Sequence, residues 1–161
     1  MCGIAGFIGS KKIDKNNIDK TILLMRNRGP DSSAYKKKLF ENKEVLLIHS
    51  RLSIIDLDSR SNQPFEDNDY TIIFNGEIYN YVELKKQIIA HGYKFKTDSD
   101  TEVILKYYQH YGESCVKYFE GMWSFAIWDN KLKKLFLSRD RFGEKPLYVL
   151  KRYNEIYFAS E

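Results

Sequence analysis

Hydrophobic residues along the 161-residue chain follow two periods, one typical of strands and one typical of helices. Short apolar, β-branched or aromatic runs predict strands at residues 3–9, 33–40, 44–49, 70–75, 123–129, 135–140, 146–151 and 156–159. Apolar residues at helical spacing predict helices at residues 14–28, 81–91 and 100–111. Because strands occupy both ends of the chain and helices lie between them, the pattern favours an α+β domain of stacked layers.

Residues with special backbone preferences mark the ends of several elements. Asn80 is a candidate N-cap of the second helix, and Ser99 or Asp98 is a candidate N-cap of the third. Short segments that contain asparagine, at 130–133 and 153–155, separate the last four strands into two pairs. Each pair is therefore predicted to form a hairpin.

Composition and charge indicate one globular domain at residues 1–161. The chain is 43% hydrophobic and 15% aromatic, which is enough to build a core. No apolar run approaches the roughly 20 residues needed to span a bilayer, so no membrane association is expected. The net charge is only +4, and the lysines form short runs without a nucleic-acid-binding motif. No nucleic-acid partner is expected either.

The chain contains two cysteines, Cys2 and Cys115, which lie far apart and outside any metal-ligand spacing. No secretory leader precedes them, so we expect a reduced protein in the cytoplasm. Cys115 is predicted to be a buried free thiol. His49, His91 and His110 are scattered along the chain, and no metal site is expected.

Cys2 directly follows the initiator methionine. Removal of Met1, which is usual before a small residue, would leave one residue with both a thiol and a free α-amine. An α-amine has a pKa of about 7.7–8.0, so near neutrality it is able to accept the thiol proton. A nucleophile beside its own base is the arrangement that nucleophilic catalysis requires.

Three further segments carry groups suited to binding a small polar substrate. Arg51 follows a predicted strand and could clamp a carboxylate with two hydrogen bonds. Asn75-Gly76 leaves another strand and offers two donors for an oxyanion. Residues 97–102 place several carboxylates at a helix start, where they could bind an ammonium group. Taken singly, each of these segments has a simpler structural explanation, as a surface ion pair, a hairpin turn or a helix cap respectively.

Taken in order, the motifs resemble the glutaminase domain of asparagine synthetases, a class II glutamine amidotransferase among the N-terminal-nucleophile hydrolases. The matching segments are residues 1–7, 28–31, 51–56, 75–81, 99–104, 121–129 and 139–148. The resemblance extends to Glu161, and the segments at 28–31, 121–129 and 139–148 favour the asparagine-synthetase branch. It implies a four-layer αββα sandwich, in which two antiparallel sheets stack between helical layers.

The resemblance also implies a glutamine site. Its ten residues are Cys2, Arg51, Leu52, Ser53, Ile54, Ile55, Asn75, Gly76, Glu77 and Asp100. Cys2 matches the nucleophile that forms a glutamyl thioester and releases ammonia, and Asn75 and Gly76 match the oxyanion hole. Arg51 matches the residue that grips the α-carboxylate of glutamine. Glu77 and Asp100 match the partners of its α-amino group. Residues 52–55 match a strand whose backbone lines the pocket.

Four residues outside this set carry further expectations. Ser61 and Ala34 stand where the family usually has glycine, so we expect local loop adjustments and an intact site. Asp140 and Arg141 suggest acid–base chemistry, but we expect them to form an ion-pair network.

The family implies a longer parent protein. An ATP-pyrophosphatase synthetase domain is expected after residue 161, and it would use ATP and Mg²⁺ to make asparagine from aspartate. The glutaminase reaction itself is expected to need no cofactor, and a homodimer is a further expectation. Two alternatives stay open. One is an amidotransferase with another acceptor, such as a sugar or cell-surface precursor, and the other is a catalytically silent glutamine-binding domain.

Overall fold

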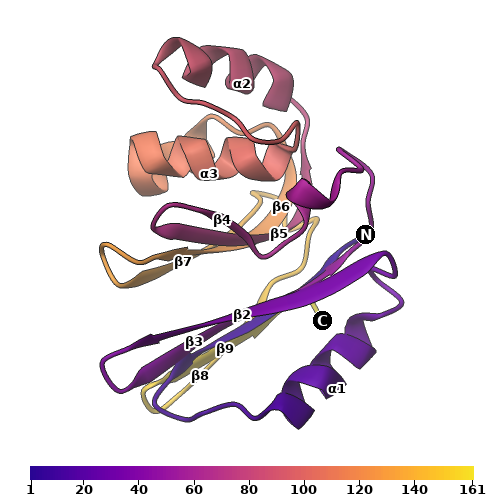
Figure 1. Cartoon of the computed structure of the whole chain (residues 1–161), viewed down its shortest axis with the longest axis vertical. Helices are drawn as coiled ribbons and strands as arrows, with labels where there is room; N and C mark the ends of the chain where they lie inside the picture. Colours follow the sequence, from indigo (N-terminus) through magenta and orange to yellow (C-terminus); the bar gives the residue numbers. More distant parts are fainter.

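The computed structural model describes residues 1–161 as two antiparallel sheets flanked by helices (Figure 1). The strands are β1 Gly3–Gly9, β2 Ser32–Phe40, β3 Lys43–Arg51, β4 Phe65–Asp67, β5 Tyr70–Ile78, β6 Gly121–Asp129, β7 Lys134–Arg139, β8 Tyr148–Arg152 and β9 Glu155–Ala159. The helices are α1 Lys15–Met25, α2 Tyr81–Ala90 and α3 Asp100–Tyr111, with 3₁₀ turns η1 Ser59–Ser61 and η2 Gly112–Lys117. No helix has the length and apolar character needed to cross a membrane.

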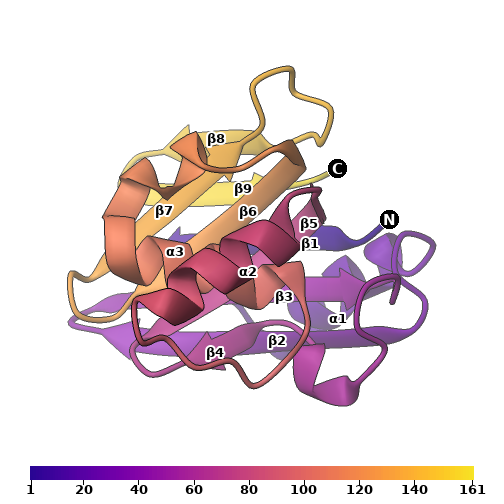
Figure 2. The same cartoon turned by 90° about the horizontal axis from the view of Figure 1, so that it is seen from above.

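The elements stack in four layers, as the αββα expectation requires. One sheet has the strand order β2-β3-β1-β9-β8 and carries α1 on its outer face, while the other has the order β4-β5-β6-β7. Helix α3 lies against β5, and α2 packs beside α3 farther from the sheet (Figure 1). Seen from above, both termini lie at the same end of the sandwich (Figure 2). The predicted fold class is therefore confirmed.

Strand β1 shows why its sequence is apolar at nearly every position. It lies in the middle of its sheet, between β3 and β9, and both of its faces are covered. Ile4 belongs to the core between the two sheets, whereas Ala5 and Phe7 belong to the core beneath α1. Successive side chains of a strand point to opposite faces, so a doubly covered strand needs a continuous apolar run. Cys2 directly precedes this buried strand, so the strand fixes the position of Cys2.

All eight predicted strands and all three helices are present, with boundaries shifted by up to three residues. The short strand β4 and the turns η1 and η2 were not predicted, because each is too short to show a hydrophobic period. Ser99 caps α3, since its Oγ accepts the Thr101 N–H at 3.0 Å. Asn80 is not a side-chain cap. Its amide instead bonds the Tyr118 carbonyl and the Glu120 N–H.

The Asn75-Gly76 pair does not end its strand, which corrects the sequence-based interpretation. Strand β5 continues to Ile78 and stays paired with β6 along its whole length. Gly76 allows this because the two backbones approach closely there. A Cβ at Gly76 would lie 2.1 Å from the Met122 carbonyl oxygen. The glycine is thus required for strand packing, and it brings Asn75 to the end of the sheet.

Asp140 organises the loop between β7 and β8 through backbone contacts. Its carboxylate accepts N–H groups from Trp123, Phe142, Glu144 and Lys145 at 2.9–3.2 Å. Burial alone would raise the pKa of Asp140, but these donors outweigh it and hold the pKa below its ordinary value. No cation pairs with Asp140, and neither Asp140 nor Arg141 forms an ion pair. The predicted ion-pair network is therefore wrong.

Replacing Asp140 by alanine is expected to lower the free energy of unfolding by about 2–4 kcal/mol, because four N–H groups lose a buried acceptor. Urea unfolding measures this change. Asp140→Asn keeps one acceptor oxygen and should cost less. An Asp140→Ala loss below about 1 kcal/mol would show that water replaces the carboxylate as acceptor.

Candidate active site

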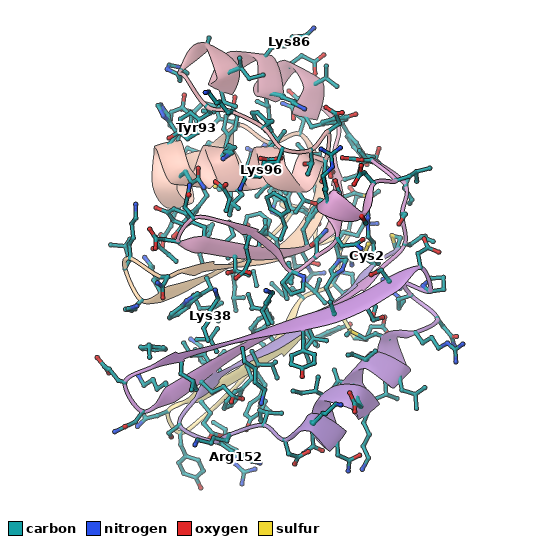
Figure 3. All side chains as sticks on the ribbon, in the orientation of Figure 1. Cys2, Lys38, Lys86, Tyr93, Lys96 and Arg152 are labelled. Atoms are coloured by element: carbon teal, nitrogen blue, oxygen red, sulfur yellow. The ribbon has the colours of Figure 1, made fainter.

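Cys2 lies just before β1 and lines a pocket at the end of the sandwich where the chain begins (Figure 3). The ends of β3, β5 and α3 reach the same pocket. Nine of the ten predicted site residues line it: Cys2, Arg51, Leu52, Ile54, Ile55, Asn75, Gly76, Glu77 and Asp100. Ser53 is the exception. It is turned away, and its N–H donates to the Asp31 carboxylate at 2.7 Å.

The Cys2 thiol is held against the backbone of Leu52. The Leu52 N–H donates to Sγ at 3.4 Å, and the thiol donates to the Leu52 carbonyl at 3.6 Å. Burial raises the pKa of the Cys2 thiol, and this effect outweighs the Leu52 N–H and the nearby positive charges of the N-terminus and Arg51. The thiol is therefore protonated at neutral pH, so its use as a nucleophile requires a base.

Asn75 presents an amide without a partner to this pocket. The residue is 1% exposed, and neither its Nδ2 nor its Oδ1 makes a hydrogen bond. A buried amide without a partner costs about 1–3 kcal/mol. Such a cost is offset when a ligand supplies the missing partner, which indicates that the pocket receives a polar molecule. Gly76 is next in the strand and lines the pocket with it.

Asp100 is the one residue of the predicted carboxylate cluster at 97–102 that enters the pocket with its carboxylate. Its Oδ2 accepts the Ile78 N–H at 3.1 Å. Burial raises the pKa of Asp100 to about 6, and the negative charge of Glu77 adds to the effect. Two carboxylates at one end of a pocket disfavour each other unless a cation lies between them.

The other two carboxylates of the cluster have structural roles. Glu102 accepts the backbone N–H groups of Lys96 and Thr97. Asp98 lies in solvent and pairs with Lys85 at 2.6 Å. Of the carboxylates in this cluster, only Asp100 is therefore placed to bind an ammonium group in the pocket.

Arg51 holds the rim of the pocket. Its Nη1 donates to the Asp58 carbonyl at 3.2 Å and to the Asn62 side chain at 2.6 Å. Its Nη2 donates to the carbonyls of Ile55 and Asp56. The terminal N–H groups are thus directed at the loop of residues 52–62, the rim loop, and no sequence motif indicated this role. Binding of a substrate carboxylate by Arg51 stays a prediction. The carboxylate would have to accept a hydrogen bond from Nε, or replace one of the present partners of Nη1 and Nη2.

Residues 52–55 are not a strand, which corrects the expectation for this segment. Strand β3 ends at Arg51, and the chain then curls around the Arg51 guanidinium. Asp56 takes a left-handed conformation with φ of 52°, which is incompatible with an extended chain. The backbone of Leu52 nevertheless reaches Cys2, as the pocket-lining role requires.

Ser61 and Gln63 line the pocket but were not among the predicted site residues. Ser61 donates its hydroxyl to Asp56 at 2.6 Å, so a serine in place of the family's usual glycine adds a bond to the rim loop. Gln63 accepts the Phe74 N–H at 2.6 Å and donates to Thr101 at 3.1 Å. It thereby ties β5 to α3 beside Asn75. Neither residue lies in the segments that match the family, and the expected loop adjustment at Ser61 was the one indication in the sequence.

His49 and Cys115 are both buried. Burial lowers the pKa of His49 to about 3, so its ring is neutral, and Nε2 bonds the Phe74 carbonyl at 3.1 Å. This bond links β3 to β5 across the two sheets. Cys115 is a free thiol in the core between α3 and the four-stranded sheet, as predicted.

The four-layer fold with its pocket at the chain's start is that of the N-terminal-nucleophile amidotransferases. A solved structure of glutamine phosphoribosylpyrophosphate amidotransferase from B. subtilis, complexed with ADP and GMP, superposes with a TM-score of 0.77. The match covers 99% of this chain and 42% of that one, at 20% identity. At this identity the likeness establishes the fold alone.

The chain belongs to the glutamine amidotransferase domain family, whose model matches residues 1–161. Asparagine synthetase (glutamine-hydrolyzing) 1 of Bacillus subtilis (strain 168) is 42% identical over the whole chain. Amidase chry2 of Gibberella zeae is 36% identical over the whole chain. The chain spans 26% of the length of each of these relatives. The predicted family is therefore confirmed. Domains of this class take ammonia from the carboxamide of glutamine.

Proposed function

We propose that this domain hydrolyses L-glutamine to L-glutamate and ammonia through a thioester at Cys2, after removal of Met1. The observation that carries the proposal is that a thiol and a buried amide without a partner, at Cys2 and Asn75, line the same pocket. An amide that makes no hydrogen bond within the protein is suited to a charge that develops only during the reaction.

The reaction begins with transfer of the Cys2 thiol proton to the α-amine of the same residue. The thiolate attacks the carboxamide carbon of glutamine, and the oxyanion receives hydrogen bonds from Asn75 Nδ2 and the Gly76 N–H. The proton on the amine then passes to the departing nitrogen, which leaves as ammonia, and a glutamyl thioester remains. Water, activated by the same amine, hydrolyses the thioester to glutamate and restores the thiol.

The amino-acid end of glutamine is held by charges at the other side of the pocket. Glu77 and Asp100 bind the α-ammonium group, which separates their two negative charges and lowers the pKa of Asp100 from its raised value. Arg51 binds the α-carboxylate, either through Nε or by exchanging one rim-loop carbonyl for the substrate.

Arg51→Lys is expected to raise KM for glutamine by about tenfold or more, because one ammonium cannot replace a guanidinium that donates to several oxygens. Steady-state ammonia release measures KM, and kcat should change less. Arg141→Lys, at an exposed residue without an ion pair, is the matched control. An unchanged KM in Arg51→Lys would mean that the carboxylate is held elsewhere.

The destination of the ammonia is proposed from the relatives. Their names include glutamine-hydrolyzing asparagine synthetases, and the chain spans 26% of the first of them. We propose that the parent protein carries a synthetase domain that uses ATP and Mg²⁺ to amidate aspartate. No residue of the present domain is assigned to either, and its own reaction is proposed to use no cofactor. We also propose that the parent protein forms a homodimer and that it works in the cytoplasm, where reducing conditions protect the Cys2 thiol from oxidation.

A second candidate function differs only in the acceptor. The relative named Amidase chry2 is 36% identical over the whole chain, although it is not named as an asparagine synthetase. A similar domain thus occurs in a protein of another name. Ammonia from the present domain could then be transferred to an acceptor other than aspartate.

One paired measurement tests the proposed hydrolysis. The intact mass of the purified protein shows whether Met1 is absent, and an enzyme-coupled assay shows ammonia released from glutamine. We expect turnover in trimmed protein and none in protein that keeps Met1, since the blocked amine cannot act as a base. Equal turnover in both forms would disprove the mechanism, and no turnover in trimmed protein would favour a silent glutamine-binding domain.

A further inference from the structure

A lysine without a carboxylate partner is buried in the wall of the proposed active site. Lys145 is 4% exposed and lines the pocket together with Met1 and Cys2. Its ammonium forms no ion pair, and its hydrogen-bond partner is the Met1 thioether. A thioether is a weak acceptor, so it compensates little of the cost of burying this charge. Packing alone would be served better by an apolar residue.

Hydrogen bonds hold the Lys145 backbone on both sides, which fixes the point from which its side chain reaches the pocket wall. The Lys145 N–H donates to the Asp140 carboxylate at 2.9 Å, and the Lys145 carbonyl accepts from Arg139 Nε at 3.0 Å. Asp140 also holds the N–H groups on either side of the turn. The ammonium is therefore presented by a fixed support rather than by a mobile loop.

Met1 lies between Lys145 and the backbone nitrogen of Cys2. The Met1 side chain contacts the Lys145 ammonium, and Met1 is bonded to Cys2. Met1 is also 46% exposed, so its removal does not open a buried core. Removal of Met1 would take away the partner of the ammonium and leave a new α-amine on Cys2, which lines the same pocket as Lys145. A positive charge near an amine disfavours its protonated form.

The other charged side chains of the pocket have observed or proposed partners, whereas Lys145 has only the Met1 thioether. The charged side chains that line it are Arg51, Glu77, Asp100 and Lys145. Arg51 is directed at oxygens of the rim loop. Glu77 and Asp100 are negative and would favour a protonated amine, but in the proposed complex they hold the substrate ammonium. Lys145 is the remaining charge without a partner of opposite sign.

Charged groups just outside the pocket already have partners. Arg28 pairs with Glu161 at 2.8 Å beyond the end of β9. Asp31 accepts the Ser53 N–H at the outer side of the rim loop. His49, in β3, is neutral because burial lowers its pKa to about 3. None of these groups replaces Lys145 as a neighbour of the amine.

We propose that Lys145 is a positioning residue whose positive charge keeps the mature α-amine of Cys2 neutral, and therefore ready to accept a proton, at neutral pH. The inference rests on the proposed function, in which this amine is the base. An α-amine with the ordinary pKa of about 7.7–8.0 is mostly protonated at pH 7. A neighbouring ammonium that lowers this pKa increases the fraction of active enzyme. The same charge also favours departure of the product as neutral ammonia.

The experiment compares Lys145→Met, which removes the charge in a similar shape, with Lys145→Arg, which keeps it, in Met1-trimmed protein. Lys86→Met is the matched control, because Lys86 is exposed on α2 and far from Cys2 (Figure 3). The rate of acetylation of the N-terminal amine by acetic anhydride is followed by peptide mass mapping from pH 5 to 10 in a Cys2→Ala background, where no neighbouring thiol captures the reagent, so that it reports the amine alone. In Lys145→Met we expect its pKa to rise by about one unit.

The activity profile gives a second readout. Because a one-unit rise leaves about tenfold less neutral amine, kcat/KM of Lys145→Met at pH 6.5 should fall about tenfold, with recovery near pH 9. Lys145→Arg and Lys86→Met should follow the wild type. An unshifted amine in folded Lys145→Met overturns the inference, as does an equal loss at all pH values or a raised KM alone.

Trimmed Cys2→Ala protein that keeps Lys145 makes the test decisive if Lys145→Met does not fold. An amine pKa clearly below that of a free Ala-Gly-Ile peptide supports the inference, and an equal or higher value overturns it. The proposed function fails differently, since it is lost if Cys2→Ala still hydrolyses glutamine.

Discussion

Cys2→Ala is expected to abolish ammonia release from glutamine, with a loss of at least about 10⁴-fold in kcat, because no other thiol reaches the pocket. Cys115 is fully buried between α3 and the four-stranded sheet and cannot substitute. Cys2→Ser should be nearly as inactive, since a hydroxyl beside a weak amine base is a poorer nucleophile. A coupled glutamate dehydrogenase assay on trimmed protein measures the loss.

Two controls make this result specific to the nucleophile. Cys115→Ala removes the other thiol and should keep activity near wild type, once its folded fraction is matched by thermal denaturation. Cys2→Ala should still bind glutamine, because Arg51, Glu77 and Asp100 are unchanged, and a ligand-induced rise in Tm shows this. Ammonia release by Cys2→Ala at near-normal rates would remove the nucleophile assignment.

Asn75→Ala is expected to lower kcat by about 10²–10³-fold, the usual effect of removing one oxyanion donor. KM should change little, because the donor acts mainly on charge that develops in the transition state. The stability prediction is unusual for a buried polar residue. The Asn75 amide makes no hydrogen bond in the folded protein, so its removal breaks none, and Tm should not fall.

The combination of lost activity and retained stability distinguishes a catalytic donor from a structural one. Asn130→Ala, in the turn between β6 and β7 and away from the pocket, is the control for an amide deletion. A kcat loss below a few-fold in Asn75→Ala under saturating glutamine would show that Gly76 and water suffice. A large fall in Tm would show instead that Asn75 has a hidden structural partner.

Much of the fold could be predicted because its strands and helices have strong periods. Strand β1 is apolar throughout since it is covered on both faces, and α3 shows one apolar side and a serine cap. Strand β4 has only three residues, which is too short for any period. The continuation of β5 past Gly76 was missed because Asn-Gly is typical of turns, whereas here the close approach of β6 requires the glycine.

Some residues of the candidate site could likewise be predicted from the sequence, and others could not. Cys2 and Asn75 could be found from residue type and motif order, and the structure places both at one pocket. The engagement of Arg51 with its own rim loop could not be found, because it depends on carbonyls of residues 55–58 that curl back in space. Lys145 was hidden for a similar reason. In the sequence it is one of many lysines, and its burial depends on the turn held by Asp140.

The central place of β1 joins the two ends of the domain. This strand pairs with β3 on one side and with β9 on the other, so its sheet is complete only after Glu155–Ala159 has been synthesised. Met1 precedes the strand and is 46% exposed, so an aminopeptidase has access to it in the folded domain as well as in the nascent chain. Protein that keeps Met1 after expression should therefore lose it on later aminopeptidase treatment, which the intact mass would show as the loss of one methionine residue.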